Sequence, residues 1–433
     1  MSASRPLVSG VRPWLRAPSA TKHILFLLCL MYLITYIDRV NIATAGGLIQ
    51  SEFHLSNKWL GFAFSGFGYS YLLLQVSGGW IADRLGAHKT LAISGLVWAG
   101  ATLLTGATTG LASLFAARLL LGIGEGATFP TATRAMANWT PAARRGYAQG
   151  IAHAFARIGN AIAPPLVVVL ISSAGWRGAF ITLGVVSLGW VLYWTIYFRD
   201  DPRRHRGCTA EEIERLPPYR DVAMRQSDPI PWRPLIRRMV PVTIVYFCYG
   251  WTLWLYLNWL PTFFLHGFNL NLKSSALFSA GVFFAGVVGD TVGGHLSDAI
   301  LRRTRNLVRA RSRLVCVGML LSLASLLPVL WLHQLSLIAV FLSLAFFFLE
   351  VTIGPMWAIP MDIAPRHSGT ASGLMNSGSA LAAILSPLVF GVIIDLTNNW
   401  TLPFVGSIAM LAVGAVLSFF MHPERPLEVR SAA

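Results

Sequence analysis

Seven ionisable side chains fall near the centres of long apolar segments of this 433-residue chain. A charged group at the centre of a lipid bilayer is costly, so it normally faces a partner or a water-filled cavity. All three bases lie in the first half of the chain, where a positive field suits an anionic ligand. The acids are Asp38, Glu125, Asp290 and Glu350, and the bases are Arg39, Arg118 and Arg157.

Two of these groups are adjacent and two are seven residues apart. Asp38 and Arg39 point about 100° apart on a helix, so each is free for another partner. Arg118 and Glu125 lie two turns, or ~10 Å, apart on one helix face. Burial favours a neutral carboxyl and a nearby arginine favours a charged one, so an anion that binds the arginine favours protonation of the acid. The alternative is that all four only form buried ion pairs that hold helices together.

The remaining polar groups at this depth leave several interpretations open. Arg157 is either a substrate ligand or the structural partner of an acid, and His153, one turn earlier, suits a hydrogen-bonded interior histidine. Asn376, the counterpart of His153 in the second half, can read hydroxyl groups as donor and acceptor. Glu350 is either a second protonatable site or an acid that packs between helices, and the role of Asp290 is equally open.

Aromatic residues are dense in segments 69–80 and 246–261. Most of them suit packing or anchoring at the membrane surface. A phenol can also donate a hydrogen bond into a cavity, and Tyr71 and Tyr246 are the best candidates for that role.

The elements that must position these residues are membrane-spanning helices. Hydrophobic residues make up 55% of the chain and charged residues only 12%, which excludes an ordinary water-soluble enzyme. Runs of about 18 or more apolar residues recur along the chain, and lipid forces such runs to be helical. The predicted fold is all-α with twelve spans, at about 23–49, 58–81, 90–109, 112–137, 146–172, 177–198, 239–265, 274–299, 313–331, 335–361, 368–395 and 400–421.

The net charge of +16 is a topology signal. Basic residues gather at the termini and in every second connection, including ten arginines from Arg199 to Arg238 and six from Arg302 to Arg313, whereas the opposite side holds only Lys58, Arg177 and Lys273. This skew places both termini in the cytoplasm of a multi-pass protein of the cell (inner) membrane. A basic surface for anionic lipid or RNA is the alternative, and we expect no nucleic-acid partner.

Two homologous halves are the strongest organisational signal. Gly78-Gly79-Trp80-Ile81-Ala82-Asp83 returns as Gly293-Gly294-His295-Leu296-Ser297-Asp298, and Glu125 with Pro130 returns as Glu350 with Pro355. The predicted boundaries are a cytoplasmic segment at 1–22, a six-helix bundle at 23–198, a cytoplasmic linker at 199–238, a six-helix bundle at 239–421 and a tail at 422–433. Within the linker, the segment Thr209 to Leu216 could start a short helix.

Parallel six-helix repeats with a site near the bilayer midplane are an architecture of secondary transporters. No catalytic nucleophile, metal cluster or nucleotide-binding loop is evident, so we predict that the chain is not an enzyme and needs no cofactor or metal. A proton gradient would supply the energy. Cys29, Cys208, Cys248 and Cys316 show no metal spacing and imply no disulfide framework.

The segment GGWIADRLGAHK, Gly78 to Lys89, resembles the cytoplasmic loop signature of the major facilitator superfamily, and GGHLSDAILRRT in the second half supports the resemblance. This resemblance implies the twelve-helix major facilitator fold. In such proteins the acid and arginine of the signature gate the cytoplasmic side. It therefore implies that Asp83, Arg84 and Asp298 are gating residues.

Further motifs resemble the anion:cation symporter family: YIDRVN from Tyr36, RLLLGIGEGATFP from Arg118, LNWLPTFF from Leu257 and ASGLMN from Ala371. That family includes permeases for galactonate, glucarate, hexuronates, tartrate and phthalate, and the sialic acid and vesicular glutamate transporters. The resemblance implies proton coupling at Asp38 and Glu125. It also implies that Arg39 and Arg118 grip a substrate carboxylate, with contacts from Tyr71 and Asn376.

The fifth span, HAFARIGNAIAPP, departs from the sugar-acid members in carrying Arg157. An extra cation would suit a dicarboxylate or an aromatic acid, so Arg157 and Tyr246 complete the predicted substrate site. We therefore predict proton-coupled uptake of a small organic anion, such as a sugar acid or an aromatic or dicarboxylic acid. The protein is expected to be a monomer, and its other partners are protons and membrane lipid.

Three alternatives remain. An exchanger of organic anions or organophosphates would need the bases but not the carboxylates. Drug efflux is disfavoured because a cationic cavity repels cationic drugs. A membrane sensor would bind anions without moving them.

Overall fold

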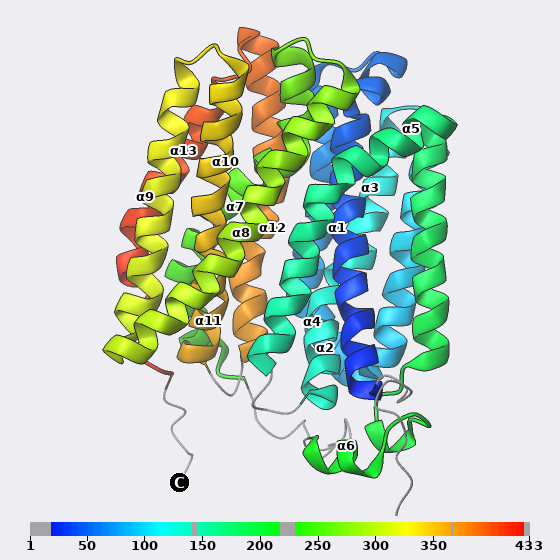
Figure 1. The fold of residues 1–433 in the computed structure, drawn as a ribbon, viewed down its shortest axis with the longest axis vertical. Helices are drawn as coiled ribbons and strands as arrows, with labels where there is room; N and C mark the ends of the chain where they lie inside the picture. Colours follow the sequence, from blue (N-terminus) through cyan, green and yellow to red (C-terminus); the bar gives the residue numbers. More distant parts are fainter. Residues whose placement is uncertain (1–18, 141–144, 217–229, 365–367, 428–433) are drawn as a thin grey trace, which may run out of the picture.

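The computed structural model describes residues 19–140, 145–216, 230–364 and 368–427; within its helices, the side chains of Asp83 and Arg84 are among those outside the description. The described residues form helices and short connections and contain no strand. Figure 1 shows long helices running roughly along one axis, with the early helices on one side and the late helices on the other. The predicted all-α fold is confirmed.

The first set of helices and the segment after it run from Ala20 to Arg215. Their bounds are α1 Ala20–Glu52, α2 Asn57–Gly106, α3 Leu111–Gly126, α4 Thr128–Trp139, α5 Arg145–Tyr197, a short 3-10 turn at Pro202–Arg204, and α6 Ala210–Arg215. The second set comprises α7 Trp232–Gly267, α8 Leu272–Thr304, a π-helical turn at Arg309–Arg313, α9 Leu314–Leu326, a 3-10 turn at Leu327–Leu330, α10 Leu335–Val351, α11 Ile353–Ile363, α12 Ser368–Thr397, α13 Pro403–Leu417 and a last 3-10 turn at Ser418–Phe420.

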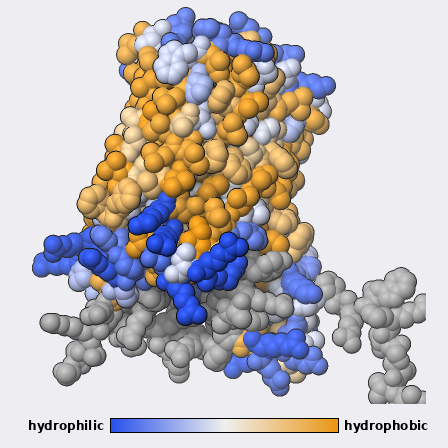
Figure 2. Space-filling model, turned by 60° about the vertical axis from the view of Figure 1, so that its left-hand side comes forward, coloured by the Kyte–Doolittle hydropathy of each residue, from blue (hydrophilic) through white to orange (hydrophobic). Residues whose placement is uncertain are grey.

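Nine helical segments of the described chain are long and apolar enough to cross a membrane. One of them, Gly150–Tyr197, holds two predicted spans, and α2 holds two more that this count omits. Both long helices break at a glycine with a left-handed backbone, Gly86 (φ 81°) and Gly175 (φ 70°). Twelve crossings result, as predicted. An apolar band between two hydrophilic ends covers the face shown in Figure 2, as a bilayer requires.

The break in α2 is fixed by an acid that follows the end of α5. Gly86 adopts φ 81°, and a Cβ atom there would lie 2.7 Å from the Asp200 carboxylate. The same carboxylate accepts hydrogen bonds from the backbone N–H groups of Ala87 (2.7 Å) and His88 (3.2 Å). A carboxylate at a helix start satisfies free N–H groups and the positive end of the helix dipole. Asp200 thus caps the second span of α2.

We expect Asp200→Ala to lower the free energy of unfolding by about 1 to 2 kcal/mol, because it removes this cap. Thermal unfolding of the purified protein in detergent measures the change. Glu211→Ala is the control, since Glu211 is an exposed acid on α6. Equal unfolding temperatures for the two variants would contradict the capping role.

Two helices break next to the buried glutamates. The predicted span 112–137 is divided into α3 and α4 at Ala127, and the span 335–361 into α10 and α11 at Thr352. Each break stands two residues after a glutamate, and a proline occupies the first turn of the following helix, where its missing N–H is tolerated. The sequence repeat is therefore also a structural repeat. It places Glu125 and Glu350 at equivalent helix ends.

The two sets of helices touch closely at the end of the molecule away from α6. A Cβ atom on Gly61 of α2 would overlap the carbonyl of Pro387 in α12, and one on Gly47 of α1 would lie 2.7 Å from Leu265 in α7. Asp395 of α12 accepts hydrogen bonds from the backbone N–H groups of Asn57 (3.0 Å) and Lys58 (2.6 Å) at the start of α2. The glycines bring the helices together and Asp395 joins them across the interface.

The linker contains the expected short helix. In α6, the Thr209 hydroxyl accepts from the Glu212 N–H at 3.2 Å and the Glu212 carboxylate accepts from the Thr209 N–H at 3.0 Å, which is a capping box. Glu212 also accepts hydrogen bonds from Ser19 and Thr21 just before and within α1. The linker helix is thereby tied to the first bundle. The predicted domain boundaries themselves stay a prediction.

Candidate functional site

Arg39 and Glu125 form an ion pair in the interior of the first helix set. Arg39 Nε donates to Glu125 Oε2 at 2.6 Å, and the side chains are 3% and 0% exposed. Arg39 comes from α1 and Glu125 from the end of α3, so the pair links two helices. Arg39 Nη2 and Glu125 Oε1 have no hydrogen-bond partner among the described residues. Arg39 can therefore still donate a hydrogen bond to a ligand, and Glu125 can still accept one, although both side chains are buried.

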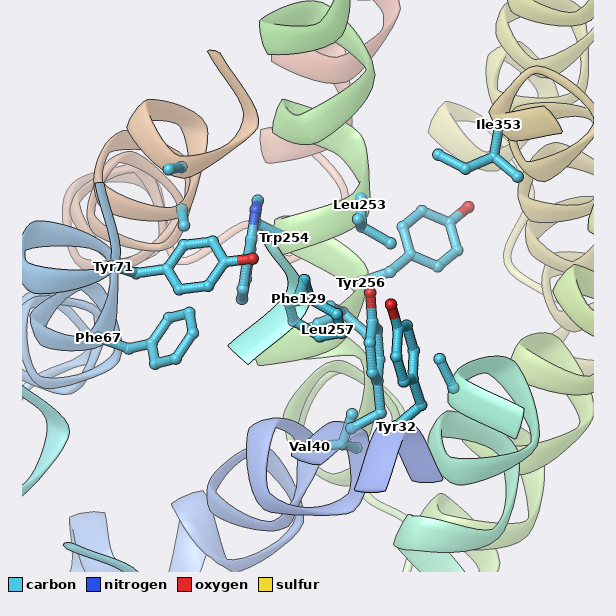
Figure 3. Close-up of a cluster of buried hydrophobic side chains, with 14 of the residues drawn as sticks. Tyr32, Val40, Phe67, Tyr71, Phe129, Leu253, Trp254, Tyr256, Leu257 and Ile353 are labelled. Carbon is cyan, nitrogen blue, oxygen red and sulfur yellow. The ribbon is translucent and has the colours of Figure 1, made fainter. Parts of the chain in front are cut away.

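Aromatic rings surround the Arg39 guanidinium. Its central carbon lies 4.7 Å from the ring centre of Tyr36 and 4.9 Å from those of Tyr71 and Phe129. Phe67 and Trp254 follow at 5.1 and 5.8 Å. Figure 3 shows Phe67 and Tyr71 side by side on α2 with Trp254 of α7 facing them. Desolvated contacts of this kind are worth up to about 2 kcal/mol each and hold the cation in an apolar setting.

Asp38 and Arg118 lie near this pair but have different partners. Asp38 Oδ2 accepts from the Ser187 hydroxyl at 3.1 Å, and Oδ1 accepts from Asn41 at 3.4 Å. Arg118 is 2% exposed, its guanidinium carbon lies 5.5 Å from the Phe67 ring, and its Nε has no hydrogen-bond partner within the described chain. Asp38 thus has neutral donors, and the expectation that it does not pair with Arg39 is confirmed.

Three polar side chains join the two helix sets beside the aromatic rings that surround Arg39. Asn376 Nδ2 of α12 donates to Gln75 Oε1 at 2.6 Å and to the Tyr71 hydroxyl at 3.3 Å, both on α2. The Tyr71 ring also faces Arg39. The structure therefore brings the predicted contacts Tyr71 and Asn376 together with Arg39.

Arg157 forms a second charged cluster with the other helix set. Its Nη2 lies 3.0 Å from Glu350 Oε2 of α10, and its Nε lies 3.7 Å from Asp290 Oδ2 of α8. The Tyr249 hydroxyl of α7 donates to Glu350 Oε1 at 2.9 Å and accepts from Arg157 at 3.5 Å. Arg157 therefore partners acids, which was one of its two predicted roles.

The two clusters share one aromatic ring. The guanidinium carbons of Arg39 and Arg157 lie 4.7 and 5.6 Å from the centre of the Tyr36 ring, so they are at most about 10 Å apart. Next to Arg157, Tyr246 stacks on Tyr249 and accepts from Trp357 Nε1 at 3.0 Å. Tyr246 thus lies beside the second cluster.

The predicted gating residues lie elsewhere. Asp83 and Arg84 fall outside the described side chains. Asp298 is 65% exposed and lies 3.9 Å from Arg311 Nη1, while Arg311 Nε donates to Asp362 at 3.1 Å. These contacts stay within the second helix set, and the gating role remains a prediction.

Four further residues belong to these clusters and were not selected from the sequence: Gln75, Tyr249, Tyr36 and Ser187. Tyr36 stands in the YIDRVN motif and Gln75 in the aromatic segment 69–80, so the sequence pattern could have indicated both as site residues. Tyr249 stands in the other aromatic segment, 246–261, whereas Ser187 had no signal beyond being polar in an apolar span.

The fold and the buried charges define a class: a membrane protein of twelve crossing helices whose two halves meet around arginines and carboxylates. The sequence model of the Major Facilitator Superfamily matches residues 28–387 and 309–433. The chain belongs to that superfamily, as the loop signature predicted.

Three curated relatives are similar over most of their length. A protein of Cupriavidus necator named a probable sulfoacetate transporter is 49% identical over 93% of this chain and 94% of its own. A probable galactarate/D-glucarate transporter of Bacillus subtilis is 29% identical over 95% and 94%. The D-galactonate transporter of Escherichia coli is 29% identical over 85% and 87%. Galactonate and glucarate permeases belong to the narrower family that the motifs resemble.

A solved structure supports the fold. A bacterial homologue of the human lysosomal transporter Spinster, in an inward-facing and unoccupied conformation, superposes with a TM-score of 0.76 at 17% identity over 94% of this chain and 97% of its own. At this identity the likeness concerns the fold alone.

Proposed function

We propose that the protein takes up a short organic dianion, of which sulfoacetate is the type, together with protons. The observation that carries this proposal is the set of buried arginines with free donors. Arg39 Nη2, Arg118 Nε and Arg157 Nη1 have no hydrogen-bond partner in the described residues. A buried charged donor without a partner is costly, and a sulfonate or carboxylate would satisfy it. The name of the Cupriavidus necator relative supports the same ligand class.

The spacing of two arginines supports a short ligand. A paired guanidinium and anion have their central atoms roughly 4 Å apart. Because the Arg39 and Arg157 carbons are at most about 10 Å apart, a ligand lying in line between them has room for anionic centres at most roughly 2 to 3 Å apart. That is the separation across a single methylene group. The carboxyl carbons of a six-carbon aldarate in extended form lie more than twice as far apart, at about 6 Å.

Protons are proposed to enter at Asp38 and Glu125. Asp38 is 1% exposed and is held by neutral donors, so its charge is not balanced by a direct ion pair among the described residues. Glu125 would lose its partner whenever Arg39 turns to an anion. In both cases a proton removes an uncompensated buried charge. The charge skew of the connections supports an inner-membrane location with both termini in the cytoplasm.

Transport by the purified protein in proteoliposomes tests the proposal. We expect labelled sulfoacetate to enter faster with a pH gradient, acid outside, and to outcompete glucarate. Uptake only by exchange for internal anion, unaffected by the gradient, would favour the anion exchanger. Uptake of glucarate in preference to sulfoacetate would contradict the short-ligand argument.

A further inference from the structure

The Arg157 cluster contains more acid than base. Arg157 of α5 faces Glu350 of α10 at 3.0 Å and Asp290 of α8 at 3.7 Å, and their side chains are 3%, 0% and 15% exposed. One guanidinium therefore serves two carboxyl groups. Other titratable groups around the cluster, among the described residues, include Tyr36 of α1, His153 of α5, and Tyr246 and Tyr249 of α7.

The cluster also crosses the interface between the two halves. Arg157 belongs to the first half, and both acids and Tyr249 belong to the second. Halves that rock to alternate access must rearrange contacts at this interface. An ion pair at this interface must therefore rearrange when the halves move. The Arg39–Glu125 pair lies within the first half and need not.

Arg157 can exchange one anion for another. Nη1 has no hydrogen-bond partner in the described chain, and the guanidinium lies 5.6 Å from the ring centre of Tyr36, which also faces Arg39. An anion bound between the two arginines would compete with Glu350 and Asp290 for the same donors. If the anion displaces them, the buried carboxyl of Glu350 and the partly buried carboxyl of Asp290 are left without their cation, and the charge on each disfavours the charge on the other.

We propose that Glu350 and Asp290 together form a second proton-binding site, which takes up a proton when Arg157 leaves them to bind the second anionic group of the substrate. This inference rests on the proposed function, since it needs an anion that reaches Arg157. Without substrate, the two acids occupy the Arg157 donors that the anion would bind. When the anion displaces them, they accept a proton. Proton uptake is then linked to ligands with two anionic groups. A monoanion bound at Arg39 alone would leave the pair undisturbed.

The test counts protons bound with the ligand. Sulfoacetate is added to the purified protein in weakly buffered detergent solution, and proton uptake per bound ligand is read with a pH indicator. The double variant Glu350→Gln/Asp290→Asn is expected to take up about one proton fewer than the wild type. The matched control Glu211→Gln/Glu214→Gln removes two exposed acids on α6 and should keep the wild-type count. A double variant with the wild-type count overturns the inference.

Infrared difference spectroscopy gives a second measurement that does not need the double variant. Adding sulfoacetate to the wild type should produce a protonated-carboxyl C=O band that is lost or shifted in Glu350→Gln or Asp290→Asn. A band unaltered in both single variants would overturn the inference while leaving coupling at Asp38 and Glu125 intact. A wild type that binds sulfoacetate without taking up any proton would overturn the proposed symport as well.

Discussion

Replacing Arg39 with glutamine is expected to lower the initial rate of sulfoacetate uptake into proteoliposomes at least about 100-fold. The guanidinium is 3% exposed and caged by aromatic rings, so an anion that reaches it loses its water and depends on charged donors. Contacts of that kind are worth roughly 3 kcal/mol, which corresponds to this factor. Arg39→Lys keeps the charge but not the paired donors, and we expect an intermediate loss.

The single variant also leaves Glu125 buried without its cation, which costs about 3 to 5 kcal/mol of stability. The variant Arg39→Gln/Glu125→Gln removes both charges; glutamine matches glutamate in size and is shorter than arginine. We expect its unfolding temperature in detergent to recover, whereas its uptake stays lost. If this neutral pair transported at the wild-type rate, Arg39 and Glu125 would be a structural ion pair and nothing more.

The second large effect concerns Asp38. We expect Asp38→Asn to abolish accumulation of substrate driven by a pH gradient while exchange of internal for external substrate continues. Each coupled proton supports about a tenfold accumulation per unit of pH gradient, and the amide cannot carry that proton. Ser187 and Asn41 can hydrogen-bond to the amide, so the fold should tolerate it.

Counterflow and gradient-driven uptake, measured on the same preparation of liposomes, separate these two activities. Glu211→Gln is the control, because it removes an acid that is exposed on α6. An Asp38→Asn protein that still concentrates substrate under a pH gradient would exclude Asp38 as an essential proton site. Loss of both activities together would instead assign Asp38 to substrate binding or to the integrity of α1.

Most of the fold followed from the sequence because lipid permits few alternatives. The length of apolar runs fixes helices, and the repeat of Glu125 and Pro130 as Glu350 and Pro355 predicted two homologous halves. The helix breaks that follow both glutamates, inside the predicted spans 112–137 and 335–361, were not predicted. The long helices α2 and α5 were predicted as separate spans. In the structure only a single glycine interrupts each of them, since a left-handed residue turns the chain without ending its hydrogen bonding for long.

The site was predictable as a set of residues but not as a set of pairs. Burial cost singles out Asp38, Arg39, Glu125 and Arg157 from the sequence alone. Which acid meets which base depends on how helices are rotated and packed, and spacing within one helix cannot supply that. Spacing had suggested that Arg118 and Glu125 act along one helix face, whereas Glu125 turns to Arg39 of α1. Likewise, nothing in the sequence placed Tyr249 against Glu350.

The contact of Asp395 with the start of α2 depends on backbone groups of α2. The carboxylate binds main-chain amides of Asn57 and Lys58, and every residue type except proline offers the same amide. Substitutions at those two positions by residues other than proline therefore leave these two backbone hydrogen bonds in place. A change of Asp395 to alanine, in contrast, would remove both backbone contacts at once and would free the two helix ends without disturbing the buried charges.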